Sequence, residues 1–459
     1  MSTPPTVAAL TDALRAGTTS AGEDLAVLGE RLHARMAALY PLPRSLTGPG
    51  VRATLDLLEQ GLDGVAAIER HEVPTGTRAH DWTITDEWAL RRAWITDTTT
   101  GDVVVDTDVH TLHVVGYSVP VRTTLSRDEL LPHLHTLPDR PDAVPYRTSY
   151  YHRTWGFCLT QRQLDGLGEG PFEVVVDADL GPGHMTYGEI LLPATEPPPD
   201  GEEAGEVLLS AHLCHPSLAN DNLSGLVLVT ELVRLLAAVP RRHAYRVVLA
   251  PGTVGAVLWL SRNADVLPRI RHGLVLTGLG GPGALVYKRT RRGDRPIDAA
   301  VSHVVRRRGG EVRDYSPWGY DERQYNALGF DLPVGRLSRT PHNEYAEYHT
   351  SDDDLGHVTP AELTDALVAL VEVVDVLEDD ARPRNLAPYG EPQLGTRGIY
   401  PTTGGRAASD AVMAMLWTLA YADGETSLLD VAARADLDFA AIRTAAATLS
   451  GADLLDGLG

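Results

Sequence analysis

Apolar residues change their spacing along the second half of the chain, and this change predicts alternating strands and helices. Short apolar runs, typical of buried strands, are separated by stretches in which Leu and Val recur at helical spacing. The predicted strands cover 173–177, 189–192, 207–211, 245–250 and 273–276, and the main helices between them cover 226–238 and 254–262. Strands that alternate with helices favour an α/β fold built on a mostly parallel sheet.

The first part of the chain predicts helices that belong to the same domain. Residues 1–22 are rich in Thr, Ala and Pro, and we expect them to be a flexible leader that is poorly ordered unless it docks. Apolar stripes then predict helices at 23–38 and 51–62. We therefore assign 23–67 and 165–390 to one α/β domain.

Between the two parts of this domain, the pattern changes to short β-prone segments separated by turn residues. This pattern predicts an inserted β-rich domain at 68–164. Two interpretations stay open: the insertion is a lid over a functional site, or it is a β domain with aromatic residues at its rim. Both interpretations are based on a dense set of aromatic and histidine side chains: His133, His135, Tyr146, Tyr150, Tyr151, His152 and Trp155.

The last part of the chain predicts a separate helical module. A long helix at 359–377, with Thr359 as N-cap and Pro360 in its first turn, closes the α/β domain. Residues rich in Pro and Gly then form a linker near 388–398. The module at 400–459 has the helix count of a winged helix, with helices predicted at 409–422, 427–433 and 438–449.

Charge and cysteine content limit the classes of partner. The chain has 62 acidic and 40 basic residues, a formal charge of -22 that disfavours nucleic acid and anionic membranes. From 407 to 459, eight acids against two arginines give -6, so we expect that module to serve packing or assembly, in a homo-oligomer for example. Two distant cysteines, no signal peptide and no membrane-length apolar run predict a cytoplasmic protein.

Basic residues concentrate in only one region, at 288–295 (KRTRRGDR) and 306–308. One interpretation is a solvated surface whose charges are neutralised by nearby acids. The other is a clamp for an anion or a carboxylate. The sequence leaves both open.

The segment SAHLCHPSLANDNLSG at 210–225 carries the clearest candidate chemistry. It joins a predicted strand to a predicted helix, and open α/β sheets collect ligands at such strand ends. His212 and Asp221 supply an imidazole and a carboxylate, which suit zinc, and the neighbouring asparagines could hold the aspartate in place. The alternative is that His212 and His215 are ordinary loop residues and that Asp221 is a helix N-cap.

A catalytic zinc needs about three protein ligands, so a further ligand must come from elsewhere in the chain. Two downstream segments contain acids and histidines: GYDERQY at 319–325 and RTPHNEYAEYHTSDDD at 339–354. His349 is the strongest candidate, because the acids that follow it could orient its second ring nitrogen.

These segments together resemble the zinc aminopeptidase-like proteins related to the M28 peptidases, in particular a bacterial family labelled by domains of unknown function. The resemblance covers nearly the whole chain after the leader. It implies a zinc-aminopeptidase-like α/β fold with an inserted β-rich domain and a C-terminal winged-helix-like module, and it implies His212, Asp221 and His349 as metal ligands. It is carried by PRSLTGPGVRATL (43–55), DWT (81–83), LHVVGYSVP (112–120), LLPHLHTLPDRPDAVPYRTSYY (130–151), WGFCLT (155–160), PGTVGAVLWL (251–260) and the three segments above.

The chain also departs from the pattern that it resembles. Gly252 and Thr253 stand where a typical M28 enzyme has a Glu-Glu pair, the general base followed by a ligand, and Thr277 and Gly278 stand where it has a ligand aspartate. Two ligands and the usual base are missing. We therefore expect one zinc ion rather than two.

The expected function is zinc-dependent hydrolysis of an amide or peptide bond in a small substrate, most simply by an aminopeptidase. Glu322 or Glu344 would replace the missing base, and Asp321 or Glu347 would hold the substrate's α-ammonium group. Two alternatives stay open. One is a dedicated amidase or deacylase for a small metabolite, and the other is an inactive binding or assembly protein, which the missing Glu-Glu pair favours.

Overall fold

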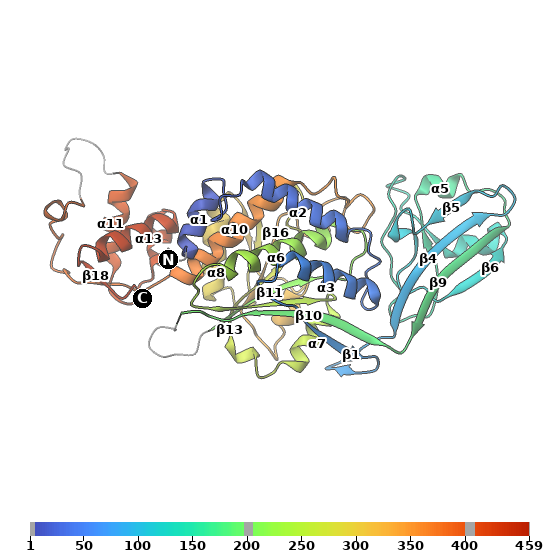
Figure 1. Cartoon of the computed structure of the whole chain (residues 1–459), viewed down its shortest axis with the longest axis horizontal. Helices are drawn as coiled ribbons and strands as arrows, with labels where there is room; N and C mark the ends of the chain where they lie inside the picture. Colours follow the sequence, from blue (N-terminus) through green and yellow to red (C-terminus); the bar gives the residue numbers. More distant parts are fainter. Residues whose placement is uncertain (1–4, 197–204, 400–408, 459) are drawn as a thin grey trace.

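A twisted sheet of eight strands forms the centre of the computed structural model, which describes residues 5–196, 205–399 and 409–458 (Figure 1). Strands β12, β11, β13 and β16 run parallel to one another, and β1, β10 and β14 add antiparallel pairs. The fold is therefore α/β with a mainly parallel core, as predicted. In sheet order the strands are β1 (Glu69–Pro74), β10 (His184–Leu192), β12 (Ala244–Ala250), β11 (Glu206–His212), β13 (Ile270–Leu276), β16 (Val334–Ser338), β14 (Val286–Lys288) and β15 (Glu311–Arg313).

Successive residues of β11 are buried in two different hydrophobic cores, because successive side chains of a strand point to opposite faces of a sheet. Val207 and Leu209 join the core formed with most of the helices, whereas Leu208 joins the core that contains α7 (Val254–Arg262). The sheet is thus covered on both faces. The first core includes α2 (Leu25–Leu39), α3 (Pro49–Gly61), α6 (Ser224–Ala237), α8 (Pro296–Arg307) and α10 (Pro360–Asp379).

The N-terminal segment corrects the expectation of a flexible leader at 1–22. Residues Val7–Arg15 form helix α1, which packs against α10 through the buried side chains of Val7, Leu10 and Leu14. The apolar spacing of these residues is helical and supplies the face that docks. Residues 1–4 lie outside the described part of the chain.

The inserted β-rich domain contains a second sheet of four strands, and this sheet extends beyond the expected limit of 164. Its strand order is β5-β4-β9-β6, and β9 contains the segment 173–177 that we had assigned to the α/β domain. Apolar positions on both faces of β9 allow it to pair with β4 and β6. The bounds are β4 (Glu87–Asp97), β5 (Val103–Asp106), β6 (Val121–Leu125) and β9 (Phe172–Gly181); shorter elements are β2 (Arg78–Ala79), β3 (Trp82–Thr83), α4 (Arg127–Leu130), β7 (Leu134–His135), β8 (Phe157–Cys158) and α5 (Gln161–Asp165).

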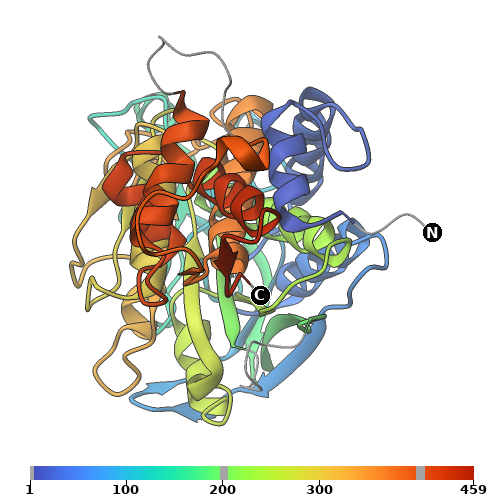
Figure 2. The same ribbon diagram turned by 90° about the vertical axis from the view of Figure 1, so that its left-hand side faces the viewer.

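The C-terminal module contains three helices and a two-stranded sheet, and it packs against the end of the molecule that carries α1 (Figure 2). Strand β17 pairs with β18, so the module includes residues well before the expected start at 400, and residues 400–408 lie outside the described part. All three helices agree with the predicted spans to within two residues. The bounds are β17 (Arg384–Asn385), α11 (Asp410–Tyr421), α12 (Leu428–Ala435), α13 (Phe439–Ser450) and β18 (Leu455–Asp456).

Ion pairs join α13 to the rest of the molecule. Arg443 contacts Asp375 of α10, and Asp438, the N-cap of α13, contacts Arg15 of α1. In a winged helix the third helix is the one that usually enters the DNA major groove. Here that helix faces the α/β domain. Across the described ranges, no helix of the structure is long and apolar enough to cross a membrane.

Candidate metal centre

Three segments that are distant in sequence bring His212, Asp221 and His349 together at the carboxyl end of the parallel strands. His212 is the last residue of β11, and Asp221 lies in the short irregular turn at 219–223 that leads into α6. His349 lies in the loop between β16 and α10, with a left-handed φ of 55° that a residue other than glycine rarely adopts. The surrounding loop therefore fixes this residue in an unusual conformation.

The carboxylate of Asp221 bonds to both predicted histidines, one through each oxygen. Its Oδ1 lies 2.8 Å from Nε2 of His212, and its Oδ2 lies 3.0 Å from Nε2 of His349. Asp221 has no solvent exposure, and His349 keeps a third of its side-chain surface exposed. The centre is thus closed on the side of the strands and open beside His349.

His215 is a further member of this cluster. His212, His215 and Asp221 offer ligand atoms within 4.8 Å of one another, and the His215 ring centroid lies 5.1 Å from that of His349. We had considered His215 only as an ordinary loop residue. Its position three residues after His212, in the same strand-end loop, was the signal that could have identified it.

The electrostatics of the cluster favour a charged carboxylate among imidazoles. Burial opposes the charge on Asp221, but His215, His212 and His349 together hold its pKa well below the ordinary value. Burial also works against a protonated His212, yet the Asp221 carboxylate raises the pKa of that ring. For His215, burial dominates and lowers the pKa well below the ordinary value, so this ring is neutral and free to act as a ligand.

Hydrogen bonds to the backbone hold the Asp221 turn in place. Asp353 accepts hydrogen bonds from the backbone N–H groups of Asn220 at 2.6 Å and Asp221 at 3.1 Å. Asn222 donates through Nδ2 to the carbonyl of Leu276 at the end of β13, at 3.0 Å. We expected the acids after His349 to orient its second ring nitrogen. Asp353 instead holds the backbone of the Asp221 turn.

The inserted domain docks directly on the loop that carries His349. The backbone N–H of Tyr146 donates to the carbonyl of His349 at 2.9 Å, and that of Ser351 donates to the carbonyl of Val144, also at 2.9 Å. The ring of Tyr146 contacts both His349 and His215, with centroid distances of 5.1 and 5.2 Å. One of the ring residues of the insertion is therefore part of the centre's wall.

Asp321 is a buried carboxylate beside the cluster, and both of its oxygens lack a hydrogen-bond partner in the described part of the chain. A Cβ atom at Gly252 would lie 3.0 Å from the Cβ of His212 and 3.4 Å from Oδ1 of Asp321. Asp321 therefore lies next to the position where the Glu-Glu pair is missing. Burial raises the pKa of Asp321 to about 7, against the opposing effect of His212.

The two glutamates expected to act as the base are engaged elsewhere. Glu322 is fully buried, with Oε1 at 2.8 Å from Nζ of Lys288 and at 3.6 Å from Arg336. Glu344 is exposed and pairs with Arg313 at 2.6 Å. A carboxylate neutralised by a cation is a poor proton acceptor, so the geometry does not support either assignment. Glu347 is half-buried in the loop of His349.

The donor set fits a zinc ion. Imidazole nitrogen and carboxylate oxygen are zinc ligands. Without a metal ion, each contact between a ring nitrogen and Asp221 needs a proton on the ring, and a divalent cation would take the place of that proton. Asp221 contacts both His212 and His349, but among the described residues the ligand atoms that all lie within 4.8 Å of one another are those of His212, His215 and Asp221. The cluster thus has the ligand types that could hold a divalent cation such as zinc.

Comparison with known proteins identifies the family of the chain. Residues 33–380 match a family described as a domain of unknown function (DUF4910), and 381–457 match a winged helix-turn-helix. A protein of Clostridium acetobutylicum that carries the provisional name polysaccharide biosynthesis protein with aminopeptidase-like domain is 42% identical over 93% of this chain and 96% of its own.

Solved structures share the same architecture. A crystal structure from Clostridium acetobutylicum, provisionally described as a peptidase, has a TM-score of 0.87 at 39% identity and covers 94% of this chain and 97% of its own. BSAP, a zinc aminopeptidase from Bacillus subtilis, has a TM-score of 0.55 at 12% identity and covers 76% of this chain and 95% of its own, a likeness of fold alone. The chain therefore belongs to the DUF4910 family, with a fold like that of a zinc aminopeptidase followed by a winged-helix module.

Proposed function

We propose that the protein is a zinc-dependent hydrolase of an amide or peptide bond, and that it acts as an aminopeptidase on a small peptide or amide. The observation that carries the proposal is the buried carboxylate of Asp221, which lies between His212 and His349 on an aminopeptidase-like fold. A purely structural ion pair with Asp221 would need only one histidine. A cation shared by the carboxylate and both histidines would explain why the second histidine comes from a distant loop.

Asp321 replaces Glu322 and Glu344 as the proposed general base. A single zinc held by His212, Asp221 and His349 would polarise the substrate carbonyl and lower the pKa of a bound water. Asp321 takes a proton from the attacking water as the water oxygen bonds to the carbonyl carbon, and it returns the proton to the amine nitrogen as the C–N bond breaks. Its pKa of about 7 suits both transfers near neutral pH.

Glu347 is the proposed contact for the substrate's α-ammonium group. It lies two residues before His349 in the same loop, and it is only half-buried. Asp321, the other residue considered for this role, lies deeper, beside His212. The two acids therefore divide the roles of proton transfer and substrate binding.

A dedicated amidase or deacylase for one small metabolite is the second candidate. It is favoured by the hydrogen bonds that fasten the inserted domain to the loop of His349, because a wall fixed at this place limits the size of the substrate. Short peptides would then stay intact, while one N-acyl compound is hydrolysed.

The proposal is tested by measuring the zinc content and the hydrolysis of a panel of aminoacyl amides and N-acyl amides. Wild-type protein is expected to hold zinc and to hydrolyse members of the panel. His349→Ala is expected to lower both zinc affinity and turnover by at least about tenfold. The matched control is His152→Ala, which alters an exposed histidine of the insertion.

Two outcomes would contradict the proposal. One is wild-type protein that holds no zinc and shows no turnover. The other is a His349→Ala variant with the zinc affinity and turnover of wild type, which would show that His349 belongs to no catalytic metal centre. Zinc that is retained without hydrolysis of any substrate, combined with tight binding of a ligand, would instead favour an inactive binding or assembly protein.

A further inference from the structure

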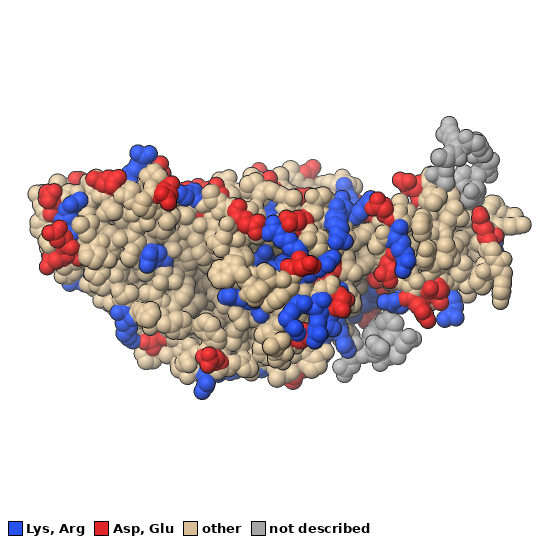
Figure 3. All heavy atoms as spheres, turned by 180° about the vertical axis from the view of Figure 1, so that it is seen from behind, with Lys and Arg blue, Asp and Glu red and all other residues tan. Residues whose placement is uncertain are grey.

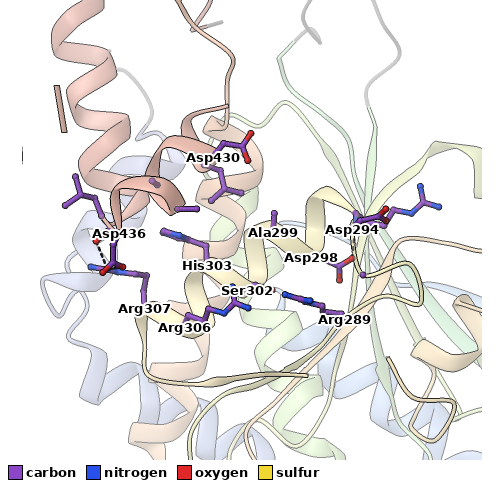
Figure 4. Close-up of a pocket in the computed structure, with 16 residues that line it drawn as sticks. Arg289, Asp294, Asp298, Ala299, Ser302, His303, Arg306, Arg307, Asp430 and Asp436 are labelled. Carbon is purple, nitrogen blue, oxygen red and sulfur yellow. Dashed lines mark hydrogen bonds and ion pairs between the residues drawn. The ribbon is translucent and has the colours of Figure 1, made fainter. Parts of the chain in front are cut away.

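A cleft between the α/β domain and the winged-helix module has a volume of about 370 Å³ (Figure 4). One wall is helix α8 with the loop before it, which carries the basic segment 288–295, and the other wall is α12. From behind, Lys and Arg side chains gather on the part of the α/β domain nearer this module, with acidic side chains between them (Figure 3). The cleft is not part of the proposed metal centre, and none of the residues described there lines it.

Buried hydrogen-bond donors in this cleft have no partner among the described residues. Ser302 is 4% exposed, and its Oγ atom makes no hydrogen bond. The Nε atoms of Arg289 and Arg295 are likewise buried without a partner. A buried polar group without a partner costs free energy, so three such groups around one space indicate that a bound molecule completes them.

Four arginines and four aspartates line the cleft, and Arg306 is the arginine among them that has no acidic partner in the described part of the chain. Asp331 is shared by three guanidinium groups, those of Arg291, Arg292 and Arg295. Arg306 lines the cleft and forms no ion pair within the ranges that the structure describes. Figure 4 shows Arg289 and Arg306 extending toward each other across the face of α8 that carries Ser302.

Three of the four acids have contacts of their own, and the fourth, Asp294, is exposed in the loop before α8. Asp298 is turned into the fold, where it accepts hydrogen bonds from Tyr287, from Thr290 and from the backbone of Arg295. Asp436 is exposed and pairs with Arg307. Asp430 belongs to the wall formed by α12, where it caps the first turn of that helix.

We propose that this cleft binds the phosphate group of a small molecule. Guanidinium groups and a hydroxyl are the donors that proteins use for phosphate oxygens, through paired and charge-assisted hydrogen bonds. The volume exceeds that of a phosphate and falls in the range of small-molecule pockets, so an organic part of the ligand has room beside α12. The site joins two domains, and its ligand therefore strengthens their contact.

The probe is pyrophosphate, added to the full-length protein at constant ionic strength with sodium chloride as the reference salt. We expect saturable binding in calorimetry and a rise in the melting temperature beyond that in chloride. Arg306→Ala is expected to weaken binding about tenfold or more, Ser302→Ala to weaken it by a smaller factor, and Arg306→Lys to restore part of the loss. The matched control is Arg313→Ala, because Arg313 pairs with Glu311 and Glu344 outside the cleft.

Arg306 is exposed, so its substitution leaves the fold intact and keeps the experiment informative. The proposal is overturned if pyrophosphate does no more than chloride. It is also overturned if Arg306→Ala and Arg313→Ala bind pyrophosphate equally well, since the effect would then be a general response of a basic surface.

Discussion

The Oδ2 atom of Asp221 lies 3.0 Å from the Nε2 atom of His349, and the two residues are 128 positions apart in the sequence. Asp353, four residues after His349, holds the turn of Asp221 by two hydrogen bonds to its backbone. The contact thus depends on a loop that supplies one proposed ligand and supports the other. The same loop therefore holds the two residues in place relative to each other.

Asp353→Asn is expected to lower zinc affinity by about 10- to 100-fold, because an amide replaces one of the two carboxylate oxygens that accept from the turn. Zinc titration of metal-free protein measures this change. Asp354→Asn is the control, since Asp354 is exposed and bonds only to the backbone of the following residues. Equal zinc affinity in both variants would mean that Asp353 does not position the turn.

Asp321→Asn is expected to lower kcat/KM by about 100-fold or more, as the loss of a general base does. The pH profile separates this role from a structural one. Burial raises the pKa of Asp321 to about 7, and only the ionised carboxylate takes up a proton, so wild-type activity should rise as the pH increases through about 7. The variant should lose this rise. A profile that keeps the same acidic limb in the variant would assign the base to another group.

Glu347→Gln is expected to raise KM for aminoacyl substrates about tenfold and to change kcat little, because the charge contacts a part of the substrate that does not react. Glu344→Gln, three residues earlier in the same loop, is the control. Its exposed carboxylate pairs with Arg313, so the substitution should leave both constants unchanged. If Glu344→Gln has the larger effect, the substrate lies on the other side of this loop.

The contact between the inserted domain and the loop of His349 predicts slow hydrogen exchange at the N–H groups of Tyr146 and Ser351. Both groups donate across the interface between the two segments. A docked insertion protects them to a similar degree. The reference is the N–H of Asp139, an exposed turn residue of the insertion whose N–H makes no hydrogen bond in the described part of the chain. Fast exchange at both positions would instead describe an insertion that opens as a lid.

Arg443→Ala is expected to destabilise the protein by about 3 kcal/mol at pH 8, because it leaves the buried carboxylate of Asp375 without its cation. Burial raises the pKa of Asp375 to about 7, against the effect of Arg443. The folded state thus binds this proton more tightly than the unfolded state, and stability is lost as the pH rises from the ordinary pKa toward 7. The loss in Arg443→Ala should therefore be smaller at pH 5 than at pH 8.

Urea unfolding of Arg443→Ala at the two pH values measures this difference. Arg434→Ala is the control on the same module, since Arg434 is exposed and lies over the ring of Tyr421. A loss for Arg443→Ala that is equal at both pH values would show that Asp375 does not contribute the pH dependence.

The apolar pattern predicted most elements of the α/β domain and all three helices of the winged-helix module. It failed where tertiary contacts determine the partner of a strand or helix. The segment 173–177 has the composition of a core strand but belongs to β9 of the inserted sheet, because strand identity does not specify a partner. Val7–Arg15 was assigned to a flexible leader, although its apolar residues supply a face that docks on α10.

For the site, residue types and spacing indicated His212, Asp221 and His349, which the fold brings into contact. The choice of a base among Asp321, Glu322 and Glu344 could not be made in advance, because it depends on cations from other segments. Lys288 neutralises Glu322 from 34 positions away in the sequence, and no periodicity reports such a pair. His215 was considered only as a loop residue, although its position three residues after His212 in the same loop could have identified it.

An anomalous difference map at the zinc absorption edge would show whether His212, Asp221 and His349 share one zinc ion. The measurement uses crystals of the native protein that have received no added metal. We expect a single peak in contact with Nε2 of His212, a carboxylate oxygen of Asp221 and Nε2 of His349. A map without a peak at this position, or with two peaks bridged by Asp221, would contradict it.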